Sequence, residues 1–219
     1  MTLIENVPFV PNTDDGMHCY QSSFLMLLRH FLPERSWSMT DAEEITDKRT
    51  DETAWPIAGP LWLVRHGFDV RVTFDFDYRA MSNEGNAYIR RRYGDEVADW
   101  QGQHGSNFVD NDLAEAFLAD VDIQQSVPKF SDITDSLERG GLAICGVNSR
   151  RLNGEDGYVG HNVVIFGIDE TYVLLHNPGP PPIEGQRVSR GDFAAAWSHP
   201  DDSGRYLMTV RPAGEPRMS

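Results

Sequence analysis

The chain has 219 residues, of which 40% are hydrophobic and 11% aromatic, and it carries 34 acidic against 19 basic residues for a formal charge of −15. This composition is typical of a globular protein with a substantial core and excludes a disordered chain. The negative charge argues against nucleic acid and anionic membranes as partners, and no stretch approaches the roughly 20 apolar residues of a membrane span. Two cysteines make no disulfide framework and no targeting segment is evident, so we expect a cytoplasmic protein.

The first third of the chain predicts three helices and a strand. After the extended lead "ENVPFVPN" and the turn "NTDDG", apolar residues at helical spacing predict a helix from Cys19 to Phe31. The segment "TDAE" (Thr40–Glu43) fits a capping box and predicts a second short helix. A third helix ending at Gly67 and a strand over Phe68–Phe74 follow.

The middle segment, residues 78–127, has weaker signals. "NAYIRRRYGDEVADW" (86–100) and "DNDLAEAFLADV" (110–121) are typical of amphipathic helices, joined by the polar loop "QGQHGSN" (101–107). We interpret this segment as a helical insertion or a lid rather than a separate domain.

The last third predicts mostly strands. A capped helix over 131–141 ends at a pair of glycines, a stiff proline-rich loop covers 178–186, and a short helix covers 189–197. The predicted strands cover residues 142–148, 159–169, 171–178 and 205–212. Helices first and antiparallel strands second indicate an α+β fold, and the absence of a repeat or linker favours one domain over 1–219.

Cys19 stands where a turn gives way to a helix. Backbone N–H groups are unpaired at a helix start and the helix dipole is positive there, so this position favours thiolate over thiol. A small buried hydrophobic residue is the alternative interpretation and the commoner fate of a cysteine. Cys145, within "LAICGV", fits that alternative and is predicted to be a core residue.

A nucleophilic cysteine requires a base, and the base requires a group that orients it. His161 opens the apolar strand "GHNVVIFGID", and Asn177 ends the next strand in "LLHNPG". Because a tight turn joins the two strands as a hairpin, the end of the second strand lies beside the start of the first. Cys19, His161 and Asn177 therefore form a candidate catalytic triad.

These segments resemble the papain-like fold, in particular family thirty-nine of the cysteine peptidases, the bacteriocin-processing type that cleaves after double-glycine leaders. The resemblance is carried by "DDGMHCYQSSFLMLLRHF", "GGLAICGVNS", "GYVGHNVVIFGIDETYVLLHNPG" and "VSRGDFAAAW". It implies a nucleophile helix packed on a C-terminal antiparallel sheet, with Cys19 as nucleophile, His161 as general base and acid, and Asn177 as orienter. It also implies a peptide or amide substrate and no cofactor or metal.

The chain departs from the family at two positions. The family usually has aspartate where Asn177 stands, and it has a glutamine of the oxyanion hole where Thr13 stands. We expect the backbone N–H of Cys19 to be one oxyanion donor and the Asn12 amide to be the second. Asp14 or Asp15 would repel an oxyanion unless protonated.

Three functions are compatible with this pattern. A thiol-dependent hydrolase of a peptide or amide bond is the leading one. The second is an acyltransferase that uses the same site, because the "HC" start is similar to that of acyltransferases of peptide-antibiotic and aminoglycoside biosynthesis. The third is a catalytically degenerate peptidase fold that binds a peptide, which the missing glutamine favours. A zinc site at Cys19 and His161 lacks any close ligand pair such as CxxC.

Overall fold

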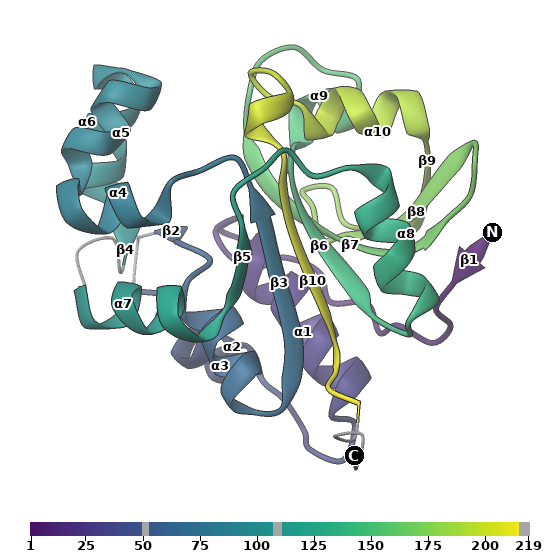
Figure 1. Ribbon diagram of the computed structural model, residues 1–219. Helices are drawn as coiled ribbons and strands as arrows, with labels where there is room; N and C mark the ends of the chain where they lie inside the picture. Colours follow the sequence, from purple (N-terminus) through teal and green to yellow (C-terminus); the bar gives the residue numbers. More distant parts are fainter. Residues whose placement is uncertain (50–52, 107–110, 215–219) are drawn as a thin grey trace.

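The computed structural model describes residues 1–49, 53–106 and 111–214 (Figure 1). Eight strands of this described part form one sheet in the order β5-β3-β10-β6-β7-β8-β9, with β1 paired to β7. Neighbouring strands are antiparallel except β3 and β5. The bounds are β1 (Thr2–Leu3), β3 (Phe68–Phe74), β5 (Asp122–Gln124), β6 (Leu142–Asn148), β7 (Gly160–Ile168), β8 (Tyr172–Asn177), β9 (Ile183–Ser189) and β10 (Tyr206–Pro212). A separate parallel pair joins β2 (Thr53–Ala54) to β4 (Gly105–Ser106).

Helices cover both faces of the sheet, as Figure 1 shows. Their bounds are α1 (Cys19–Phe31), α2 (Met39–Ile45), α3 (Ala58–Arg65), α4 (Tyr78–Glu84), α5 (Asn86–Tyr93), α6 (Asp95–His104), α7 (Asn111–Asp120), α8 (Phe130–Glu138), α9 (Ser149–Leu152) and α10 (Arg190–Trp197), with a 3₁₀ turn at Asp202–Gly204. Because side chains alternate along a strand, the central strands β6, β7 and β10 supply both cores. Leu142 and Ile144 pack with α1 and α3, whereas Ala143 and Cys145 pack with α8 and α10.

The predicted α+β fold is confirmed, with the helix that begins at Cys19 packed against β7 of a largely antiparallel sheet. The described helices are no candidates for membrane crossing, since none combines the required length with the required apolarity. The predicted capping box of the second helix is wrong by two positions. Ser38 and Asp41 form it instead, because α2 begins at Met39 and Asp41 is then its third residue.

Two further predictions differ from the structure. The segment 86–100 was expected to be one helix, but Gly94 separates α5 from α6 with a φ of 90°, a conformation that favours glycine. Residues 183–186, expected as part of a stiff loop, belong to β9. Residues 183–186 follow the prolines at 180–182, so their backbone N–H groups can pair with β8. They therefore form part of the edge strand of the sheet.

The helices of residues 78–127 share the core of α1 and the sheet. Tyr88, Ile89 and Phe117 belong to the same buried cluster as Val70 and Val72 of β3. β5 also extends the sheet by pairing with β3. That the whole chain folds as one domain with a helical insertion remains our proposal.

We expect Phe117→Ala to lower the free energy of unfolding by about 3–5 kcal/mol, because its buried ring leaves a cavity beside Tyr78. Val97→Ala, at a position that is 40% exposed in the same segment, is the control and is expected to change stability by less than about 0.5 kcal/mol. Urea unfolding of both variants measures this. A Phe117→Ala protein as stable as the parent would show that this ring does not contribute to the shared core.

Candidate active site

Cys19 is the first residue of α1, and His18 occupies the N-cap position before it without a capping bond from its side chain. The first helical hydrogen bond runs from Ser22 N to His18 O. Within the described residues the backbone N–H of Cys19 has no acceptor, as a helix start leaves it. This N–H therefore remains available to an oxygen that approaches the sulfur.

Asn12 holds the loop that leads to Cys19. Its side-chain oxygen accepts from Thr13 N and His18 N, both at 2.9 Å. Its amide nitrogen donates to Gly179 O at 2.9 Å and to Gly16 O at 3.1 Å. Both amide hydrogens are thus in use, so the expected role of Asn12 as second oxyanion donor finds no support in this arrangement. Its hydrogen bonds explain instead how the loop before α1 is tied to the segment after β8.

His161 and Asn177 meet as the hairpin predicts. The imidazole Nε2 of His161 lies 2.8 Å from Asn177 Oδ1, and both side chains are buried. In the register of the two strands, Val164 pairs with His176, which places Asn177 diagonal to His161 on the same face. His176 bonds Val7 O and Gly185 N instead, away from the imidazole.

The orientation of the Asn177 amide follows from its backbone neighbour. Gly179 N donates to Asn177 Oδ1 at 3.0 Å, so the atom that faces this N–H is the oxygen. Asn177 Nδ2 donates to Gln186 Oε1 at 3.1 Å. Since Oδ1 is an acceptor, Nε2 of His161 carries the hydrogen, and Nδ1 is the nitrogen that remains for Cys19.

The pKa values of Cys19 and His161 are shifted toward a thiolate–imidazolium pair. Burial raises the pKa of the Cys19 thiol, but the hydrogen bond and charge of His161 and two bonds from Asn162 outweigh it, so the net pKa is lowered. Burial lowers the pKa of His161, whereas Cys19 and Asn177 raise it, and the net pKa is raised. Burial alone raises the pKa of Cys145, which is therefore a poor nucleophile.

Asn162 was missed by the sequence analysis. Its side-chain Nδ2 lies 3.8 Å from Cys19 Sγ, and its backbone N–H also bonds the sulfur. Alternation along β7 turns Asn162 to the face of Val164, which packs with α1. A polar residue beside the candidate histidine, facing the nucleophile helix, was the available signal.

We expect Asn162→Ala to raise the pKa of Cys19, because the side-chain bond that favours the thiolate is lost while the backbone bond stays. Asn162→Asp should raise it further by placing a carboxylate beside the sulfur. The pH dependence of iodoacetamide alkylation, followed by intact mass, measures both shifts. Profiles identical to the parent in both variants would exclude a role of this side chain at the sulfur.

The side chain of His18 connects the loop before α1 to α2. Its Nε2 lies 2.7 Å from Glu43 Oε1 of α2, and its Nδ1 lies 2.6 Å from Thr13 Oγ1 and 3.2 Å from Asp15 Oδ1. A hydrogen bond from Thr13 is the main cause that lowers the pKa of Asp15 to about 2, so Asp15 is ionised and cannot donate to an oxyanion. These contacts connect the loop to α2 rather than to the thiol.

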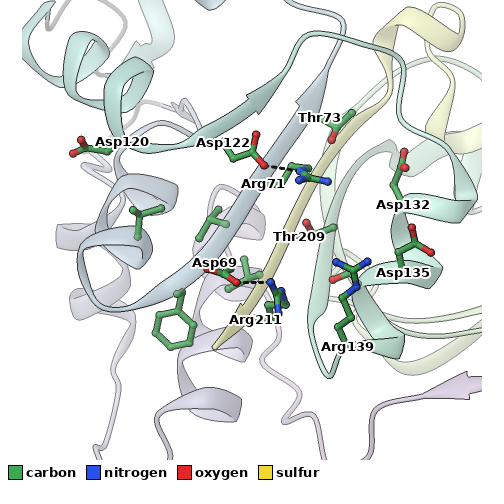
Figure 2. A pocket seen from close by; sticks show the side chains of 15 residues that line it. Asp69, Arg71, Thr73, Asp120, Asp122, Asp132, Asp135, Arg139, Thr209 and Arg211 are labelled. Carbon is green, nitrogen blue, oxygen red and sulfur yellow. Dashed lines mark hydrogen bonds and ion pairs between the residues drawn. The ribbon is translucent and has the colours of Figure 1, made fainter. Parts of the chain in front are cut away.

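A cavity of about 420 Å³ lies over β3, β10 and α8, away from Cys19, His161 and Asn177. Figure 2 shows that Arg71 pairs with Asp122 there and Arg211 with Asp69. No cysteine or histidine of the described residues lines it, so it offers no nucleophile–base pair. The described ranges also contain no group of three His, Cys, Asp or Glu side chains placed to hold a metal ion.

Comparisons with known proteins were made at three levels. No protein-family model matches the chain, and a search of curated proteins finds no match. Among solved structures, the chain is similar to the peptidase domain of Streptococcus ComA, a bifunctional ABC transporter involved in quorum sensing, with 12% identity, a TM-score of 0.48 and coverage of 94% of this chain and 98% of that one.

It is also similar to a putative C39-like peptidase from Bacillus anthracis, with 17% identity, a TM-score of 0.47 and coverage of 96% and 97% of the two chains. C39 is the family that the sequence resembles. The activity of this chain has to be argued from its own site.

Proposed function

We propose that the protein is a papain-like, thiol-dependent hydrolase that cleaves a peptide or amide bond through an acyl-enzyme on Cys19. One observation carries this proposal: the thiol at a helix start contacts a buried imidazole whose other nitrogen is held by an oriented amide oxygen. Structural cysteines lack such partners, as Cys145 illustrates.

Acylation follows from the protonation state of the pair. The Cys19 thiolate attacks the substrate carbonyl carbon and forms a C–S bond, and the oxygen that becomes negative accepts from the backbone N–H of Cys19. The tetrahedral intermediate then breaks its C–N bond. His161 supplies the proton from Nδ1 to the departing amine and becomes neutral, leaving a thioester on Cys19.

Deacylation uses the same residues in reverse. Neutral His161 takes a proton from water, the resulting hydroxide attacks the thioester carbon, and the C–S bond breaks to release a carboxylic acid and the thiolate. Asn177 accepts from Nε2 throughout and stabilises the imidazolium whenever it forms. With one oxyanion donor available from the described backbone, we expect a modest rate on simple amides.

The proposal is tested with p-nitrophenyl acetate, whose leaving group needs no proton. We expect a burst of p-nitrophenol of about one equivalent per chain and a single acetyl group on the peptide that contains Cys19. Cys145→Ala is the control and should give the same burst. Absence of a burst, with alkylation of Cys19 no faster than that of glutathione, would exclude the enzyme and favour a peptide-binding module.

A further inference from the structure

A cavity of about 290 Å³ opens beside His161 and Asn162. We call it the histidine-side pocket. Cys19 and the loop 12–18 are not among the described residues that line it. His161 forms part of the wall of this pocket and also contacts the thiol of Cys19, so it connects the pocket to the nucleophile.

Apart from His161 and His199, the wall of the histidine-side pocket is aromatic or neutral. None of the described lining residues is Asp, Glu, Lys or Arg, although the chain as a whole carries a formal charge of −15. The aromatic residues come from five separate segments of the chain. They are Trp55 before α3, Phe74 and Tyr78 in β3 and α4, Tyr158 before β7, Trp197 in α10 and Tyr206 in β10.

This lining restricts what the pocket accepts. In the acyl-enzyme, where the proposed reaction leaves His161 neutral, a charged group would lose its hydration without a lysine, arginine or carboxylate to pair with, so it is disfavoured. Aromatic side chains bury large flat apolar surfaces and pair with other rings. The volume lies near the lower end of ligand pockets, about 300 Å³, so it suits one ring-sized group rather than a longer peptide.

The position of the pocket indicates which part of a substrate it holds. In the proposed reaction His161 gives a proton to the leaving group and takes one from the acceptor. The atom that exchanges this proton lies next to the imidazole, and so does the group attached to it. We propose that the histidine-side pocket binds the leaving group or acyl acceptor, and that it selects an uncharged aromatic ring. This inference rests on the proposed function.

The acceptor side is tested by capturing the acetyl-enzyme with O-alkyl hydroxylamines, which are neutral nucleophiles at pH 7. The amine nitrogen attacks the thioester carbon and a C–N bond forms. His161 takes the proton, the C–S bond breaks, and the thiolate is released. We expect O-benzylhydroxylamine to capture the acetyl group about tenfold faster than O-methylhydroxylamine. Aminooxyacetate, which carries a carboxylate, should be no faster than the methyl compound.

A matched pair of variants locates the effect. Tyr158, 57% exposed at the pocket, stacks on His199 at 4.1 Å, and Trp100, 44% exposed and outside the described lining, stacks on His104 at 4.9 Å. Tyr158→Ala should reduce the benzyl-to-methyl rate ratio to below about three. Trp100→Ala should keep the parent ratio. A parent ratio near one, or a ratio unchanged by Tyr158→Ala, overturns the proposal.

Binding without chemistry separates the pocket from the enzyme. In the Cys19→Ala protein, we expect N-benzylacetamide to bind more tightly than N-methylacetamide, as measured by NMR titration. Equal binding of the two compounds overturns the proposal, even where the nitrophenol burst is present. A missing burst with selective binding rejects the enzyme and retains the pocket.

Discussion

His161→Ala is expected to reduce the rate of the nitrophenol burst by about a thousandfold or more. In the parent, the bond and charge of His161 and two bonds from Asn162 together outweigh the burial that raises the pKa of Cys19. Without the imidazole, the two largest contributions that oppose burial are lost, and the pKa of the thiol rises. Iodoacetamide alkylation at pH 6 should then slow by about a hundredfold, because the fraction of thiolate falls as the pKa of the thiol rises.

The control for this prediction is His176→Ala, which removes a buried histidine of the neighbouring strand that bonds Val7 O and Gly185 N instead of the thiol. It should leave alkylation of Cys19 at pH 6 within about threefold of the parent. Thermal unfolding of both variants shows whether each protein is folded. A folded His161→Ala protein that still reacts at the parent rate would mean that the helix start alone activates Cys19.

Asn177 is expected to act through the charge state of His161. Two substitutions of Asn177 should shift the pKa of His161 in opposite directions. Asn177→Ala removes the oxygen that accepts from Nε2, so the pKa of His161 falls and the imidazolium becomes less stable. Asn177→Asp keeps an acceptor and adds a negative charge, so the pKa of His161 rises. We expect the alanine variant to lose about 10- to 100-fold in burst rate and the aspartate variant to stay within about tenfold of the parent.

The pH–rate profile of Cys19 alkylation checks the sign. The protonated imidazole lowers the pKa of the thiol, so a less stable imidazolium moves the acid limb of the profile to higher pH. Asn177→Ala should therefore shift this limb upward and Asn177→Asp should shift it downward. Shifts in the same direction, or no shift in either folded variant, would show that Asn177 only stabilises the backbone turn at Gly179.

Local signals in the sequence determined the elements that carry the reacting groups. Apolar residues at helical spacing predicted α1 from Cys19 to Phe31, and apolar runs bounded by turns predicted β7 and β8 within two residues of their ends. The contact between His161 and Asn177 was also predictable, because a hairpin with a short turn sets which strand ends lie together. The fold class follows from the same order of elements.

Only the tertiary structure decided the groups that surround this pair. Asn12 was expected to face the substrate, but it bonds Gly179, 167 positions away, and no local signal specifies that partner. Asn162 meets the sulfur because β7 packs on α1, and the histidine-side pocket exists because aromatic residues of five distant segments converge beside His161. Periodicity and turn chemistry act over a few residues, whereas these contacts depend on how whole elements pack, which is why the nucleophile and base were predictable and their surroundings were not.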